Sequence, residues 1–155
     1  MRYEHSSDLN ERISDIVSVL SLDYIDLSKI ASFRSYGTNS RRVIARCHGL
    51  PKVMQLGLKT EPFYVIEVIS ERFDKMSYED QTKVLIHEIL HIPKSFGGGF
   101  RQHDFVNRKT VEMIYRQYKQ LKEKETSPIQ TEEKEGRTFG IMEQIIQSFS
   151  MNDKE

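Results

Sequence analysis

The segment His87-Glu88-Ile89-Leu90-His91 constrains the fold of this chain more than any other feature of its sequence. It lies in a stretch with helix signals at both ends, since Ser77 with Asp80 three residues later resembles a capping box and Pro93 ends the pattern. The apolar residues of this stretch share one helical face, and they are Val84, Leu85, Ile89 and Leu90. We therefore expect an amphipathic helix that buries one side and stops before Pro93.

The two histidines of this segment form a candidate metal site. Positions i and i+4 lie one turn apart on the same face of a helix, so both imidazoles can reach one Zn²⁺ at about 2.0–2.1 Å. Glu88 directly follows the first histidine, and from there a carboxylate can take a proton from water activated by the metal. The pattern predicts a zinc peptidase that binds about one zinc ion per chain through His87 and His91, with Glu88 as catalytic base.

A catalytic zinc site needs a third protein ligand, and His103 is the leading candidate. The flexible run Gly97-Gly98-Gly99 lets the chain reverse after Pro93 and bring His103 back over the metal. We expect His103 at the start of a long helix over residues 103–124. Asp104 is an alternative ligand, a helix cap, or an acceptor that orients one of the imidazoles.

Cys47 and His48 also compete for the third position. Peptide deformylases combine a similar helix with a cysteine ligand, so a deformylase-like enzyme would need Cys47 at the metal. Cys47 shares a predicted strand face with Val43 and Ala45, and this favours a buried structural thiol. His48 is expected to be a strand-end residue.

Hydrophobic periodicity predicts an α+β fold with a small mixed or antiparallel sheet. The predicted elements are, in chain order, a helix over residues 8–22 capped by Asp8, strands over 31–35 and 42–48, a short helix over 51–58, a strand over 63–69, the metal-site helix, and a helix over 103–124. A turn signal at residues 37–40 joins the first two strands as a hairpin. The strand over residues 63–69 is the most β-rich stretch and is expected at the centre of the sheet or at its substrate-binding edge.

The composition changes after residue 124, which we predict to be the end of the folded domain 1–124. Residues 125–138 are highly charged and contain few apolar side chains, as is typical of a linker. Residues 139–155 place large apolar side chains at helical spacing. We expect the part over residues 139–150 to pack on the domain or to bind a partner protein.

Charge and cysteine content exclude several classes of protein. Lys+Arg and Asp+Glu both number 23, so the net charge does not indicate a nucleic-acid partner. Cys47 is the single cysteine, which rules out an internal disulfide and fits a reducing compartment. No apolar run approaches the roughly 18 residues that span a bilayer, and the first residues lack the apolar core of a signal peptide. We expect a soluble, cytoplasmic protein without a membrane partner.

Four segments carry a family resemblance: residues 45–51, 64–69, 87–94 and 98–104. They resemble a zincin-type metallopeptidase family of archaea and phages, which is itself distantly similar to the SprT/Wss1-type minimal proteases. The resemblance covers residues 44–118. It implies a compact zincin-like α+β domain that acts on protein or peptide substrates, with His87, His91 and His103 as zinc ligands and Glu88 as general base.

The remaining roles stay open from the sequence. Oxyanion stabilisation has four candidates, namely Tyr64, Arg101, Tyr115 and Tyr118. In zincins an edge strand near the metal helix binds extended peptide, and residues 63–69 and 42–48 both fit. A non-catalytic zinc-binding interaction module is the main alternative, but a structural site would be closed by four ligands rich in cysteine. One cysteine, and a glutamate beside the first histidine, favour an open catalytic site.

Overall fold

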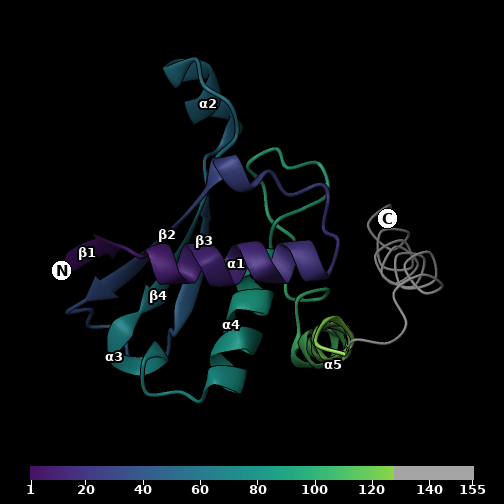
Figure 1. Cartoon of the computed structure of the whole chain (residues 1–155). Coiled ribbons are helices and arrows are strands. Elements are labelled where there is room, and N and C mark those ends of the chain that lie inside the picture. The colour runs from purple at the N-terminus through teal and green to yellow at the C-terminus, as the bar shows by residue number, and fades with distance from the viewer. Residues whose placement is uncertain (128–155) are drawn as a thin grey trace.

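The chain forms a mixed four-stranded sheet covered by helices, as shown by a computed structural model that describes residues 1–127 (Figure 1). The elements in chain order are β1 (Arg2–His5), α1 (Ser7–Val19), the 3-10 turn η1 (Leu27–Lys29), β2 (Ile30–Tyr36), β3 (Ala45–Gly49), α2 (Lys52–Leu58), β4 (Tyr64–Ile69), α3 (Ser70–Phe73), α4 (Tyr78–Leu90) and α5 (Arg108–Glu125). The α+β class and the mixed sheet agree with the prediction. The predicted C-terminal segment and nearly all of the predicted linker lie outside the described residues, so the division at residue 124 stays a prediction.

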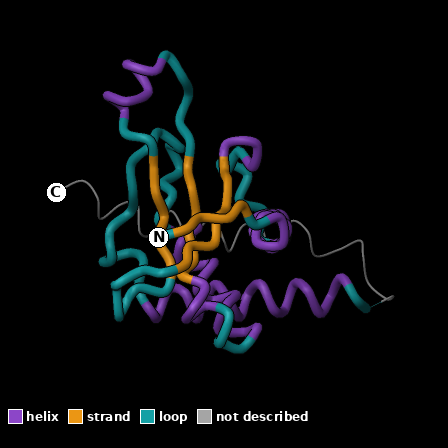
Figure 2. Tube along the Cα trace, turned by 90° about the vertical axis from the view of Figure 1, so that its left-hand side faces the viewer, coloured by secondary structure: helices purple, strands orange, loops and turns teal. Residues whose placement is uncertain are grey.

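The strands, drawn in orange in Figure 2, pair in the order β1-β2-β4-β3, so β4 has a neighbour on each side. β4 pairs in parallel with β2 and antiparallel with β3. Most β4 side chains are buried, including Tyr64, Ile66 and Val68. Side chains buried on both faces are typical of a strand in the interior of a sheet, and here β2 and β3 pair with the two edges of β4. Of the two positions expected for this strand, the centre of the sheet or its substrate-binding edge, the structure shows the central one.

The hairpin predicted between the first two strands is wrong, because β4 lies between β2 and β3. Gly37 does leave β2 with a positive φ of 79°, as a turn requires. The chain then continues across the end of β4, where the Arg72 guanidinium donates to the carbonyl oxygens of Ser40 and Val43. The Ile69 amide donates to the Ile44 carbonyl at 2.8 Å, and this bond aligns β3 with β4 instead of β2.

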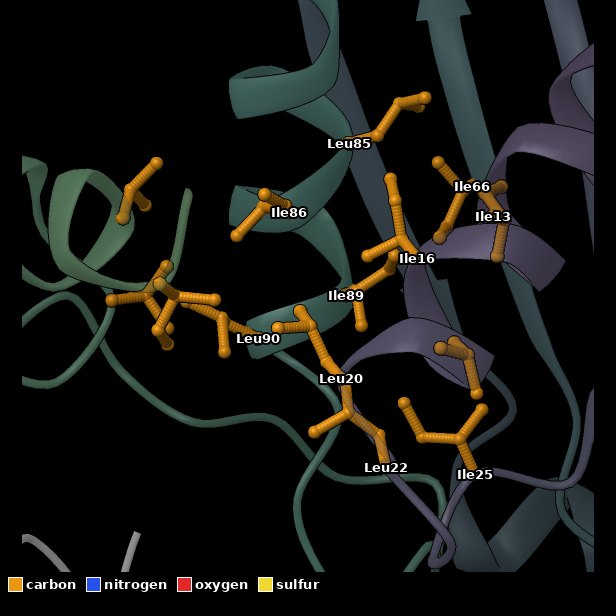
Figure 3. Close-up of a cluster of buried hydrophobic side chains, with 14 of the residues drawn as sticks. Ile13, Ile16, Leu20, Leu22, Ile25, Ile66, Leu85, Ile86, Ile89 and Leu90 are labelled. Atoms are coloured by element: carbon orange, nitrogen blue, oxygen red, sulfur yellow. The ribbon is translucent and has the colours of Figure 1, made fainter. Parts of the chain in front are cut away.

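One hydrophobic core joins the sheet to α1 and α4 (Figure 3). Side chains from these elements and from the segment after α1 converge there, and the labelled ones are Ile13, Ile16, Leu20, Leu22, Ile25, Ile66, Leu85, Ile86, Ile89 and Leu90. Each fully buried Leu or Ile side chain contributes roughly 1.5–3 kcal/mol relative to its exposed state. The packing fixes the direction of α4, which contains the first histidine of the metal motif and has the second as its C-cap residue.

Helix ends agree with the prediction in α4 and differ in α1 and α5. The Ser77 hydroxyl accepts the Asp80 amide at 3.1 Å, so α4 begins as predicted. α1 has Ser6 at its N-cap position, while Asp8 lies in the first turn and forms an ion pair with Arg34 at 2.7 Å. α5 begins at Arg108, after the cap residue Asn107, because the Asn107 side chain accepts the Thr110 amide at 3.0 Å.

No helix in the part of the chain that the structure describes combines the length and the apolarity needed to cross a lipid bilayer.

Candidate metal centre

The end of α4 and the loop that follows it bring three histidines together. His87 lies in the last turn of α4, His91 caps the end of this helix one turn later, and His103 returns to them from the loop before α5. One ring nitrogen of each lies within 4.8 Å of the others. The ring centroids of His103 lie 5.8 Å from His87 and 4.9 Å from His91. Within residues 1–127 this is the group of side chains arranged to hold a metal ion.

The spacing and orientation of the imidazoles suit a zinc ion. The Nε2 atoms of His87 and His91 are 3.2 Å apart, and two nitrogens bound tetrahedrally to one ion at 2.0–2.1 Å lie about 3.4 Å apart. His91 Nδ1 lies 2.7 Å from the Arg101 carbonyl oxygen. Since a carbonyl only accepts, Nδ1 carries the proton, and the Nε2 lone pair of a neutral imidazole is left for a metal.

Arg101 thus contributes a backbone group to the orientation of His91. Its amide also donates to the His91 carbonyl at 2.8 Å, so two bonds join the loop to the end of α4. Asp104, the sequence candidate for this orienting role, instead accepts the Phe105 amide at 2.9 Å through its side chain. The structure does not bring Asp104 into the histidine group.

The glycine loop reaches this position because it packs directly on the chain between β3 and β4. Gly98 adopts φ 98°, and a Cβ atom there would overlap the Leu50 carbonyl oxygen, so only glycine fits. The Gly98 amide donates to the Tyr64 hydroxyl, which in turn donates to the Gly99 carbonyl, both at 2.8 Å. The Gln55 side chain donates to the Gly97 carbonyl, also at 2.8 Å. Tyr64, an oxyanion candidate from the sequence, therefore holds the loop.

Comparison with known protein families shows the family to which the chain belongs. A family model described as "Putative phage metallopeptidase" matches residues 1–129. The chain belongs to this phage metallopeptidase family. No curated protein and no solved structure gives a match. The family indicates a metal-dependent peptidase, with a protein or peptide as substrate, and the three histidines are a possible site for its metal.

Burial keeps two histidines of this phage metallopeptidase in the form that binds metals. Burial lowers the pKa of His87 to about 4, with smaller contributions from His91 and His103. Burial also lowers the pKa of His91, against the opposing effect of the bond to the Arg101 carbonyl. Both imidazoles are therefore neutral at neutral pH, and a neutral ring is what a metal ligand requires.

Glu88 of α4 is buried beside Cys47 of β3, and its carboxyl group is a weaker acid than a free glutamate. Burial raises the pKa of Glu88 to about 7, and a hydrogen bond from the Cys47 backbone partly opposes this rise. A carboxylate with a pKa near the working pH is suited to accept a proton and then return it.

Cys47 lies close to Glu88 but outside the histidine group. It is paired with Ile66 across β3 and β4 and packs against the hydrophobic core. Burial raises the pKa of Cys47 to about 12, and the charge of Glu88 adds to this effect. His48 lies on the other face of β3, where it donates to the buried Glu67 carboxylate at 2.7 Å. The structure brings neither residue to the three histidines.

The other oxyanion candidates of this family member have partners elsewhere. The Tyr118 hydroxyl donates to Asp15 of α1 at 2.5 Å. The Tyr115 ring lies 5.0 Å from the ammonium of Lys83, a residue one turn before His87 on α4. The Arg101 guanidinium lies 4.7 Å from the centre of the Phe105 ring. None of these contacts involves the three histidines.

Two features of the metal centre carry no recognisable sequence signal. The Arg101 carbonyl is a backbone group that every residue has, and Gln55 lies in a helix far from the motif in sequence. The triglycine run does indicate a close backbone approach, although not which segment it approaches.

Proposed function

We propose that this metallopeptidase is a zinc enzyme in which His87, His91 and His103 bind the ion and Glu88 is the general base. The observation that carries the proposal is the convergence of three imidazole nitrogens within 4.8 Å at the end of the helix that contains Glu88. Three nitrogen ligands suit zinc and leave a fourth position open, as in catalytic sites.

The bound ion, Glu88 and the Arg101 carbonyl would each have a separate role in the reaction. Bound zinc supplies Lewis acidity, which polarises the substrate carbonyl and acidifies a water molecule. Glu88 accepts the proton of the attacking water and returns it to the leaving amine, since its pKa of about 7 allows both transfers near neutral pH. The Arg101 carbonyl keeps His91 in one tautomer throughout, because it accepts the Nδ1 proton.

An extended substrate fits one of the two strands expected for that role. β4 is excluded, because β2 and β3 occupy both of its edges. β3 lies at an edge of the sheet as described, and its Cys47 is next to Glu88. We assign backbone pairing with the substrate to β3, which would place a peptide alongside the general base.

Metal analysis combined with a peptide-library cleavage assay tests the proposal. We expect about one zinc ion per chain in purified protein, loss of cleavage after chelation, and recovery when zinc is added back. The added zinc should also raise the melting temperature, because an ion that binds the folded state stabilises it. A protein that takes up no zinc, or that cleaves equally well after chelation, would contradict the proposal.

Cys47→Ser separates this proposal from a deformylase-like reaction. We expect unchanged zinc content and unchanged peptide cleavage, because Cys47 lies outside the histidine group. The native thiol should also react with iodoacetamide at pH 8 roughly a thousandfold more slowly than the thiol of protein unfolded in guanidinium, because a pKa of about 12 leaves little thiolate. Loss of zinc in Cys47→Ser would support the deformylase-like reading instead.

A further inference from the structure

The helix α2 exposes its apolar side chains and buries a polar one. Val53, Met54, Leu56 and Leu58 are 74%, 47%, 67% and 61% exposed, whereas Gln55 is 3% exposed. Figures 1 and 2 show α2 projecting beyond the ends of β3 and β4, away from the other helices. We name residues 50–63, which connect these strands, the arm. Gathered aliphatic side chains on a projecting element are typical of a binding surface.

The base of the arm is bonded to the loop that leads to the metal centre. The buried Gln55 side chain donates to the carbonyl oxygens of Leu50 and Gly97, both at 2.8 Å. The Leu50 amide donates to the Phe63 carbonyl at 2.9 Å, which closes the two ends of the arm. These bonds hold the arm in one position relative to the glycine loop, so the projection is built into the fold.

Two exposed aromatic side chains lie at the base of the arm. Phe63 ends the arm, and Phe100 follows the glycine loop; both are large hydrophobic side chains exposed to solvent. The Phe100 ring packs at Gly49, since a Cβ atom there would lie 3.0 Å from Phe100 Cζ. Phe100 precedes His103 by three residues. A chain bound along the arm would therefore approach the metal centre.

The charges beside the exposed aliphatic side chains of the arm are positive. Lys52 and Lys59 flank the exposed aliphatic side chains, and residues 50–60 contain no acidic residue. Glu61, just beyond them, forms an ion pair with Lys29. The arm therefore complements a partner that combines apolar and acidic residues.

We propose that the arm binds apolar, acidic segments of unfolded polypeptide substrates and delivers them to the metal centre. This inference rests on the proposed peptidase function. Four side chains expose on the order of a few hundred Å², less than the roughly 800 Å² per partner of a stable dimer. A helix as short as Lys52–Leu58 also lacks the long apolar face of membrane-surface helices.

The double variant Val53→Thr/Leu56→Asn tests the arm with little change of side-chain shape. The long probe is β-casein, an unfolded acidic protein, and the short probe is the best short peptide from the cleavage library. We expect the ratio of kcat/KM for β-casein to kcat/KM for the short peptide to fall about tenfold, because two exposed anchors are lost. Met113→Gln, which alters an exposed apolar residue on α5, is the matched control and should leave this ratio unchanged.

A binding measurement tests the arm proposal even if the wild-type protein cleaves neither probe. Labelled β-casein should bind the Glu88→Gln protein, and the arm substitutions should raise the Kd about tenfold. Failure of cleavage with intact, arm-dependent binding would refute the peptidase function and support the arm.

Three outcomes would overturn the arm proposal. The first is an unchanged ratio together with an unchanged Kd. The second is arm-dependent binding to vesicles of equal parts phosphatidylcholine and phosphatidylglycerol without arm-dependent binding to β-casein. The third is a wild-type dimer that the arm substitutions convert to monomer, measured by sedimentation.

Discussion

Glu88→Gln is expected to abolish peptide hydrolysis while the protein keeps its zinc. Glutamine preserves the shape of the side chain but cannot accept the proton of the attacking water, and loss of a positioned general base typically costs about 10²–10⁴-fold in rate. The zinc content should not change, because Glu88 lies outside the group of three histidines that we propose as ligands. The measurement is kcat/KM on the best library peptide, paired with metal analysis of the same sample. A fully active variant would exclude Glu88 as the base.

The same substitution is expected to stabilise the metal-free protein above pH 7. The pKa of Glu88 is about 7 in the folded state against 4.5 for the free side chain. Between these values the folded state binds more protons than the unfolded state, so the free energy of unfolding falls as the pH rises. The loss is complete above pH 7 and amounts to roughly 3 kcal/mol.

Urea unfolding of metal-free protein at pH 4.5 and pH 8 measures this effect. The wild-type protein should lose roughly 3 kcal/mol more between these pH values than Glu88→Gln, in which the titrating group is absent. An equal pH dependence of the two proteins would show that Glu88 is not held in an unfavourable buried position. A buried carboxylate that destabilises the folded state is what we expect of a group that serves catalysis rather than stability.

His103→Ala is expected to lower zinc affinity by about 10²–10³-fold, since binding energies of zinc sites correspond to roughly 3 kcal/mol per ligand. His103 is exposed and lies in a loop, so its removal should change the stability of the metal-free protein little. The zinc-dependent rise in melting temperature should shrink accordingly. A competition titration with a chromophoric chelator measures the affinity directly.

Asp104→Asn is the matched control for His103→Ala, because it alters the next residue of the same loop. We expect normal zinc affinity, since Asp104 accepts the Phe105 amide and does not belong to the histidine group. If Asp104→Asn lost zinc and His103→Ala retained it, the ligand set would have to be redrawn around the carboxylate.

The sequence by itself determined the features that depend on neighbouring residues. The cap at Ser77, the amphipathic helix, and the placement of His87 and His91 on one face all follow from local periodicity and spacing. The β-rich composition of residues 63–69 also predicted a strand there, although it left open whether that strand is central or at an edge. These features involve residues within a few positions of one another, so their pattern is visible in the chain.

Only the tertiary structure decided which distant segments meet. Local turn chemistry predicted a hairpin at residues 37–40. In the structure, β3 instead pairs with the edge of β4 that β2 does not occupy. The return of His103 depends on Gly98 packing against Leu50 and on the bonds from Gln55 and Tyr64. These contacts join segments that lie more than thirty residues apart, and no local pattern in the sequence encodes which of them pair.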